Sequence, residues 1–451
     1  MQIFSFSLIL LFSFISLLQA QNPQEKRADE LLNRYWELNR FNGTALVVKD
    51  QKVVFNKGYG LADYEHNIPI NNKTVFCITS ITEQFTAYIA LKVFEKKGLS
   101  LTTPIITFLE NVKFSHADSL TLHHLLSHTS GFPDYPLIYE LPKNQLFAKE
   151  DIIGHLENIA WSSNHVSEYH QSKLNYNLVG LILERVTNKS FGELLEEYIC
   201  SPVGMKNTTL DDLTPMVKNR AMGYSVNFAD GWFNAPYLDP SNTFASQGIL
   251  STTEDLLLWN NFIRKNYSQD KVLQDMLTTN ESGFGYGLWV KRSEEGKVKE
   301  IRSLGGYSSG FNSFSILNIN SDLTVIVLGN NRNPSSEDIA DGLHSIFTNK
   351  DYTLPLPRKI VKIDSLILQK LAGDYKMNEH VTIKVMVEGD KVFVNDGMHP
   401  KHEIFPQSEN QFFLKGVDGE MIFIKNEKGI ITKIGLRDDG FTNAFAEKVQ
   451  K

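Results

Sequence analysis

The pattern of apolar and polar positions predicts an α+β domain over most of the chain. Residues 28–41 and 80–97 carry apolar side chains at helical spacing, and Gly98 supplies a common helix stop. Period-two alternation, typical of strands, comes before and after a helical, loop-rich middle that ends at about residue 275. The strand segments are 44–48, 52–56, 58–63, 284–291, 312–318 and 323–329. Because strands flank the helical insert on both sides, we expect one antiparallel sheet, flanked by helices, that is completed from both ends.

A second unit begins after Leu354–Lys359 (LPLPRK), whose two prolines are typical of a linker. From Asp374 onward the alternation is nearly continuous, and glycines recur at intervals that suit hairpins. We therefore predict one domain over 21–355 and a small all-β domain, resembling a partial barrel, over 356–451. No polar cluster in this second domain is typical of a catalytic site, so an accessory role in packing or in covering substrate is favoured.

Composition and charge exclude several classes of protein. The 451 residues are 42% hydrophobic and 22% charged, which is enough to bury a sizeable core and excludes a disordered chain. The formal net charge of −7 leaves no basic excess for a phosphate backbone, so we expect no nucleic-acid partner. The two cysteines, Cys77 and Cys200, cannot form a disulfide framework. Whether they pair stays open, although two separate buried thiols are favoured.

The first twenty residues form an uncharged apolar run that ends at Ala20, which is typical of a secretory signal peptide. The run lacks a basic residue near its start, so an uncleaved anchor is the alternative. No later stretch reaches the roughly 18 apolar residues that span a membrane. We predict that residues 1–20 are removed and that the mature chain, starting near Gln21, is secreted or periplasmic without a transmembrane segment.

Ser80 stands at the start of the second predicted helix, and its local sequence allows two interpretations. A serine at a helix N-terminus lies in a positive field, among backbone N–H groups that can form half of an oxyanion hole. The pattern Ser80-x-x-Glu83 also matches a capping box, in which the two side chains satisfy each other's orphan N–H groups. Local sequence alone favours the capping box.

Longer blocks of sequence resemble the serine β-lactamase and penicillin-binding-protein superfamily, in its class C-like branch. They occur in family order at 75–105, 120–135, 175–205, 245–259, 284–290 and 304–314. The resemblance implies an antiparallel sheet flanked by helices, a helical subdomain, and an active site between the two. It also implies that the C-terminal unit is the small β-domain often appended to such hydrolases.

The three catalytic motifs of this superfamily are degenerate in the chain. Ser-x-x-Lys reads Ser80-x-x-Glu83, so the serine is kept and the lysine that moves its proton is lost. Tyr-x-Asn falls on Gln171-x-Lys173, and the Lys- or His-x-Gly motif reads Ser-Leu-Gly from Ser303. A serine hydroxyl is a weak nucleophile without a neighbouring base, so the family's usual acyl-serine chemistry is not expected.

The loss of motif side chains does not remove the backbone groups that the family uses. The N–H groups of Ser80 and Gly306 are expected to form the family's oxyanion hole, which depends on the main chain. Tyr169 is the nearest tyrosine to the second motif, but it lies two residues early. Because Glu83 and Lys173 exchange the charges of the family pattern across the cleft, we expect them to form a salt bridge that locks the site.

These residues favour an exported, β-lactamase-related pseudoenzyme that keeps a cleft for a small-molecule, peptide or cell-wall-like ligand. The alternative is an active esterase, amidase or peptidase in which Ser80 attacks and Glu83 or Lys173 serves as a rearranged base. No cofactor or metal is indicated, because His124 and His128 have suitable i,i+4 spacing but no obvious third ligand. Aromatic residues such as Tyr286 and Trp289 either line the cleft or, as is more common, belong to the core.

Overall fold

The computed structural model describes residues 22–109, 118–133, 152, 168–212, 216–227, 231–331, 335–378, 381–395, 401–414, 419–438 and 441–449. The predicted signal peptide lies outside these residues. Within the described part of the chain, no helix combines the length and the apolar content that crossing a membrane requires.

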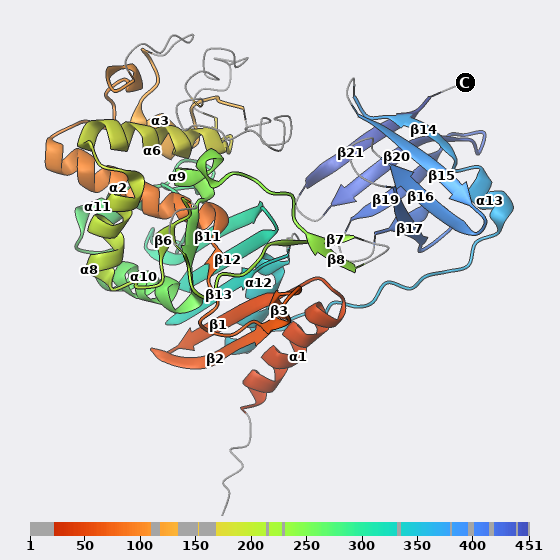
Figure 1. Cartoon of the computed structure of the whole chain (residues 1–451), viewed down its shortest axis with the longest axis horizontal. Helices are drawn as coiled ribbons and strands as arrows, with labels where there is room; N and C mark the ends of the chain where they lie inside the picture. The colour runs from red at the N-terminus through yellow and green to blue at the C-terminus, as the bar shows by residue number, and fades with distance from the viewer. Residues whose placement is uncertain are drawn as a thin grey trace, which may run out of the picture.

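A six-stranded antiparallel sheet forms the centre of the N-terminal domain, in the order β10-β11-β12-β13-β1-β2 (Figure 1). Its strands are β1 (Gly43–Lys49), β2 (Lys52–Tyr59), β10 (Trp289–Arg292), β11 (Val298–Ser308), β12 (Phe311–Asn318) and β13 (Leu323–Gly329). β1 pairs with β13 from Gly43↔Gly329 to Lys49↔Leu323, so the two ends of the domain meet in the middle of the sheet. The expected α+β fold, with a sheet completed from both ends, is confirmed.

Alternation along the strands sends side chains to two separate cores. On one face, Val325 and Val327 of β13 pack with the helices α1 (Pro23–Glu37) and α12 (Ser336–Phe347). On the other face, Ile326 and Leu328 belong to a larger core that includes the helical subdomain. Each β13 residue therefore serves one core or the other, as the period of two requires.

The helical subdomain and three small sheets lie between β2 and β10 in sequence. Its helices and short turns are η1 (Thr79–Ile81), α2 (Thr82–Lys97), η2 (Ile105–Thr107), α3 (Leu122–Leu126), α6 (Lys173–Thr187), α7 (Phe191–Leu195), η4 (Glu196–Cys200), α8 (Ser201–Val203), η5 (Pro240–Asn242), α9 (Phe244–Gln247), α10 (Thr253–Asn266) and α11 (Lys271–Met276). The small sheets pair β3 (Leu61–Asp63) with β4 (Ile68–Pro69), β9 (Ile249–Ser251) with β5 (Phe76–Cys77) and β6 (Thr209–Leu210), and β7 (Tyr224–Asn227) with β8 (Gly231–Asn234).

The first helix starts and ends earlier than its apolar pattern predicted. α1 begins at Pro23 because the Asn22 side chain accepts a hydrogen bond from the Gln24 N–H and caps the helix. It ends at Glu37, just before Asn39, whose positive φ of 56° is incompatible with continued helix. α2 does end at Lys97, and Gly98 adopts the left-handed conformation (φ 65°) of a helix stop.

The C-terminal domain is a closed eight-stranded barrel, drawn in blue in Figure 1. After α13 (Ser365–Gln369) come β14 (Gly373–Lys376), β15 (Thr382–Glu388), β16 (Lys391–Asn395), β17 (His402–Pro406), β18 (Gln411–Phe413), β19 (Glu420–Lys425), β20 (Ile431–Asp438) and β21 (Phe441–Lys448). The sequence suggested a partial barrel, but pairing of Tyr375 with Lys448 joins the first strand to the last. Closure leaves no free sheet edge between these two strands and surrounds a core that contains Tyr375, Phe412 and Phe423.

Candidate functional site

Ser80 is positioned by a tight turn that is fixed to the central sheet. Thr79 has a positive φ of 49°, an unfavourable conformation for a residue with a branched side chain. Ser313 of β12 holds this turn in place: its Oγ donates to the Ile78 carbonyl (2.6 Å) and lies 3.0 Å from Thr79 Oγ1. The sheet therefore stabilises the strained conformation that brings Ser80 to the start of α2.

A bulge in β11 brings a second stretch of main chain against the same turn. The register of β11 against β12 shifts between Leu304 and Gly306, which leaves Gly305 without a pairing partner on β12. A Cβ atom at Gly305 would lie only 1.8 Å from Ser313 Oγ and 2.3 Å from Thr79 Oγ1, so only glycine allows this approach. Gly306 has a positive φ of 59° and open space around its Cα. The Ser80 turn and the Gly305–Gly306 bulge thus form a main-chain frame around the site.

The side-chain partner of Ser80 is an amide. Gln247, the last residue of α9, donates from Nε2 to Ser80 Oγ at 3.0 Å. Ser80 is 5% exposed and Gln247 is 3% exposed, and Gln247 Oε1 has no hydrogen-bond partner among the described residues. Neither atom of a carboxamide is a base, so this contact orients the serine without activating it.

Glu83, which stands at the position of the family lysine, is held by a buried histidine. Its Oε2 lies 3.3 Å from His128 Nε2, and the two residues are 2% and 0% exposed. The other ring nitrogen, Nδ1, accepts from the Ser172 N–H at 3.3 Å and lies 3.0 Å from Asn175 Nδ2. Because donors face Nδ1, the proton of the neutral ring is on Nε2 and is donated to Glu83. Glu83 Oε1 is buried without a hydrogen-bond partner among the described residues.

This arrangement corrects two expectations for Glu83. The predicted salt bridge with Lys173 is wrong, because Glu83 Oε2 accepts from His128 and Oε1 has no hydrogen-bond partner among the described residues. Lys173 is the first residue of α6 and is only partly buried, so its ammonium avoids the desolvation that pairing with a fully buried Glu83 would require. The capping box is also wrong: neither η1 nor α2 has a side-chain hydrogen bond at its N-cap.

The second and third motif segments contribute main chain where the family uses side chains. Gln171 is exposed, and the segment reaches the site through the N–H of the next residue, Ser172, on His128. Ser303 is buried on β11, where it pairs with Ser315 of β12. The structure therefore brings Ser80, Glu83 and the β11 motif strand together but leaves the side chain of Gln171 outside the buried network.

Tyr169 lies beside this network in spite of its offset in the sequence. Its ring centroid is 5.9 Å from that of His128, 5.1 Å from Phe284 and 5.3 Å from Trp289. Burial, together with the negative charge of Glu83, raises the pKa of Tyr169 well above its usual range. The phenol therefore stays protonated at neutral pH and is unsuited to accept a proton from Ser80.

The remaining candidates have structural roles. His124 Nδ1 accepts from the Thr121 N–H and completes the cap of α3, while His128 faces Glu83 instead of a shared metal position. Among the described residues, no group of three or more histidine, cysteine or acidic side chains is arranged to hold a metal ion. Cys77 and Cys200 are free thiols that contact the carbonyls of Gln247 and Thr208.

Comparison with known families decides the identity of this fold. A family model described as Beta-lactamase matches residues 28–347. The chain belongs to the β-lactamase family. A second model, described as a domain of unknown function (DUF3471), matches residues 357–450, which contain the barrel. The family match thus covers most of the domain in which Ser80 lies, and the expected superfamily is confirmed.

The relatives match different shares of the chain. Penicillin-binding protein 4* of Bacillus subtilis is 24% identical, over 92% of this chain and 97% of its own length. Protein flp of Staphylococcus aureus is 25% identical over 68% of this chain, and the match spans 64% of that protein. The octameric penicillin-binding protein homologue from Pyrococcus abyssi has 23% identity and a TM-score of 0.62, covering 94% of this chain and 99% of that one. This structural likeness shows that the fold is shared.

Proposed function

We propose that this protein is an exported, non-hydrolytic member of the β-lactamase family whose cleft binds a peptide or cell-wall-like ligand without covalent chemistry. The observation that carries the proposal is the hydrogen bond from buried His128 to Glu83, at the position where the family places its lysine. A carboxylate at this position cannot supply the positive charge of a lysine, and its Oε2 is fixed by the hydrogen bond from His128.

The groups around Ser80 are each unsuited to remove its proton. Gln247 presents an amide, Tyr169 is held protonated, and His128 already uses its Nδ1 as an acceptor and its Nε2 as a donor. Loss of general-base catalysis alone typically costs about 10²–10⁴ in rate. The alternative in which Glu83 is a rearranged base gains no support, because the side-chain partner of Ser80 Oγ among the described residues is Gln247 and not Glu83.

Binding is supported by the main-chain frame that remains. The Ser80 turn and the β11 bulge keep two backbone segments in close approach, and backbone N–H groups in such a frame can bind a carbonyl or a carboxylate oxygen. A relative that matches over both domains is named a penicillin-binding protein, and penicillin is an acylated, cyclised dipeptide. A peptide-like ligand is therefore the class that the proposal favours.

Peptides released from digested cell wall provide the test of this function. Equilibrium dialysis against the purified protein should retain a subset of these peptides, and mass spectrometry should recover them with unchanged masses. The Ser80→Ala variant should bind the same subset, since no bond to Ser80 Oγ is required. New products formed by the unsubstituted protein and absent with Ser80→Ala would reject the non-hydrolytic assignment.

Export is tested separately, on the chain expressed with its own first twenty residues. The charge-free apolar run that ends at Ala20 predicts cleavage before Gln21. Intact-mass measurement of secreted or periplasmic protein should therefore give a chain that starts at or near Gln21. Recovery of the protein with Met1 retained would contradict this part of the proposal.

A further inference from the structure

Two side-chain oxygen atoms close to Ser80 are buried without a hydrogen-bond donor. Glu83 Oε1 and Gln247 Oε1 have no hydrogen-bond partner among the described residues, and the two residues are 2% and 3% exposed. The donors at these side chains serve other atoms: His128 Nε2 donates to Glu83 Oε2, and Gln247 Nε2 donates to Ser80 Oγ. A buried acceptor without a donor costs free energy, and the cost is larger for a charged carboxylate. This part of the site is therefore suited to a donor that a ligand brings.

The unmatched charge beside Ser80 is negative. Glu83 replaces the lysine of the family motif, and the His128 ring that faces it is neutral, with its proton on Nε2. A cationic donor at Glu83 Oε1 would form an ion pair as well as a hydrogen bond, and charge-assisted hydrogen bonds are the stronger class. The site therefore favours a ligand with a positive charge over a neutral one.

Three aromatic rings form a cluster next to this carboxylate. The ring centroid of Tyr169 lies 5.1 Å from Phe284 and 5.3 Å from Trp289, and the last two are 5.2 Å apart. The ring of His128, which holds Glu83, lies 5.9 Å from Tyr169 and 5.2 Å from Phe284. The face of an aromatic ring attracts a cation, more strongly when the cation is desolvated. The rings and the carboxylate therefore favour the same kind of ligand.

A glycine brings the loop before β10 against the start of α2. Gly287 has a positive φ of 76°, and a Cβ atom there would lie 2.5 Å from main-chain atoms of Glu83 and Gln84. Because only glycine fits, the loop packs directly on the helical turn that carries Glu83. Phe284 and Trp289 flank Gly287 in the sequence, so the loop brings two of the three rings to this turn.

The aromatic cluster extends from the buried carboxylate to the protein surface. Tyr169 and Trp289 are partly exposed, whereas Phe284 and Glu83 are buried. The two partly exposed rings are thus the side of the cluster that a ligand meets first.

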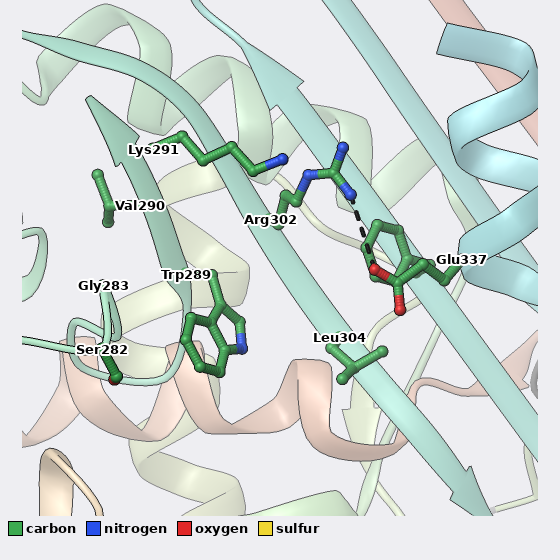
Figure 2. Close-up of a pocket in the computed structure, with 9 residues that line it drawn as sticks. Ser282, Gly283, Trp289, Val290, Lys291, Arg302, Leu304 and Glu337 are labelled. Carbon is green, nitrogen blue, oxygen red and sulfur yellow. Dashed lines mark ion pairs between the residues drawn. The ribbon is translucent and has the colours of Figure 1, made fainter. Parts of the chain in front are cut away.

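The basic side chain on the strand beside Trp289 is held away from the cluster. Arg302 of β11 lies over the ring of Phe314 and pairs with Glu337 at 3.7 Å. Figure 2 shows this ion pair apart from the Trp289 ring. Within the part of the chain that the structure describes, no lysine or arginine lies over any of the three rings of the cluster. The rings are therefore available to a cation from outside the chain.

We propose that the site binds its ligand through an ammonium group, which pairs with Glu83 Oε1 and lies against the rings of Tyr169 and Trp289. The inference rests on the proposed function, because it names the charged group by which a ligand is held there without covalent chemistry. The ammonium of the ligand takes the place of the lysine ammonium that the chain lacks at Glu83. Peptides and cell-wall fragments with a free amine fit the site, and those whose amines are acylated do not.

The test compares benzylammonium with benzyl alcohol, which has nearly the same shape but no charge. The full chain labelled with 5-fluorotryptophan reports on five tryptophans, and the Trp289→Phe variant identifies the fluorine resonance of Trp289. Both titrations are made at neutral pH and constant ionic strength. We expect benzylammonium to shift this resonance saturably, with a dissociation constant about tenfold below that of benzyl alcohol.

Removing the carboxylate should abolish this preference. In Glu83→Gln the two probes should bind with equal affinity, whereas Glu281→Gln, at an exposed carboxylate of the loop before β10, should keep the tenfold difference. Tyr169→Leu keeps the carboxylate, removes one ring, and should weaken the binding of benzylammonium about threefold. Circular dichroism checks that each variant is folded. If Glu83→Gln is unfolded, Tyr169→Leu and the comparison of the two probes still decide the proposal.

Four results would overturn the ammonium site. They are the lack of a saturable shift at millimolar benzylammonium, equal affinity of the two probes for the unsubstituted protein, a preference that survives in Glu83→Gln, and an affinity that Tyr169→Leu leaves unchanged. Equal affinity of the two probes would mean that Glu83 Oε1 accepts from water alone.

The outcomes also separate the ammonium site from the proposed function. Equal binding of the two probes rejects the ammonium site and leaves the non-hydrolytic function standing. Hydrolysis of cell-wall peptides that is lost in Ser80→Ala rejects the non-hydrolytic function, while the preference for benzylammonium, measured in the Ser80→Ala background, still decides the ammonium site.

Discussion

The main chain and the side chains of the candidate site differ in how far they match the catalytic site of the family. The turn at Ser80 and the bulge at Gly305–Gly306 keep the close approach of two backbone segments. At the position of the family lysine, by contrast, the side chain is Glu83. It hydrogen-bonds to His128, a residue that belongs to none of the three catalytic motifs. The comparison indicates that packing against the sheet holds the backbone frame, and that hydrogen-bond partners hold the side chains.

The packing constraint on the frame is local and severe. Any side chain at Gly305 would collide with Ser313 and Thr79, and Ser313 in turn holds the strained turn. The frame therefore persists as part of the sheet domain whether or not Ser80 reacts. The constraint on Glu83 is of another kind: a buried carboxylate is costly unless a donor faces it, and His128 supplies that donor.

The largest expected effect comes from removing that donor. His128→Ala leaves the Glu83 carboxylate buried without a hydrogen-bond donor and should lower the free energy of unfolding by about 3 kcal/mol or more, the cost of an unsatisfied charged group in the interior. Urea denaturation at neutral pH measures the change. Glu83→Gln is the matched control: it removes the charge, keeps an acceptor for His128, and should stay within about 1 kcal/mol of the unsubstituted protein. Equal losses in the two variants would show that the charge is not what His128 compensates.

The backbone frame can be broken at one glycine and spared at its neighbour. Gly305→Ala should cost about 3 kcal/mol, since its Cβ would meet Ser313 Oγ and Thr79 Oγ1. Gly306→Ala has open space and should cost only about 1 kcal/mol, from its positive φ. Thermal denaturation of the two variants gives the comparison. If Gly306→Ala were the more damaging substitution, the proposed packing constraint on the bulge would be refuted.

A smaller, pH-dependent effect is expected at Glu300, a buried carboxylate at the start of β11 that has cationic partners. Burial raises its pKa, but the hydrogen bond and charge of Arg302, with Lys291, outweigh this effect, so the pKa is lowered overall. The resulting stabilisation is complete above the unfolded-state pKa of about 4.3 and is lost as pH falls through the lower folded-state value. Glu300→Gln should therefore be destabilised by about 1 kcal/mol near neutral pH, and the difference should shrink below about pH 4. A difference that stayed constant into strong acid would contradict the charge argument.

Sequence could predict much of the fold because the fold depends on extended blocks with a regular pattern. The strands β1, β2, β12 and β13, the end of α2 at Gly98 and the family fold follow from periodicity, a helix stop and resembling blocks spread along residues 75–314. The motif strand β11 (Val298–Ser308) was not among the predicted strands, and β10 begins at Trp289 and not at residue 284. The start of α1 was predicted five residues late, because Asn22 and Pro23 define it by capping and not by apolar spacing.

The network around Glu83 could not be predicted in the same way. Its donor, His128, is remote in sequence, and its i,i+4 spacing with His124 says nothing about Glu83, since the two rings have different partners. Gln247 was missed as the partner of Ser80, although it lies in the resembling block 245–259 and could have been singled out as a polar residue there. Charge complementarity suggested Lys173 for Glu83, but it says nothing about which group reaches a buried carboxylate.

The central claim is that side-chain replacement, and not loss of the backbone frame, leaves Ser80 without acyl chemistry. The most direct measurement is intact-mass analysis after exposure to a fluorophosphonate, comparing the unsubstituted protein with a variant that carries Glu83→Lys, Gln171→Tyr, Lys173→Asn and Ser303→His. The account predicts no adduct on the unsubstituted protein and a stoichiometric adduct at Ser80 of the restored variant, abolished by Ser80→Ala. Stoichiometric labelling of Ser80 in the unsubstituted protein, or a restored variant that is folded by circular dichroism yet unlabelled, would contradict it.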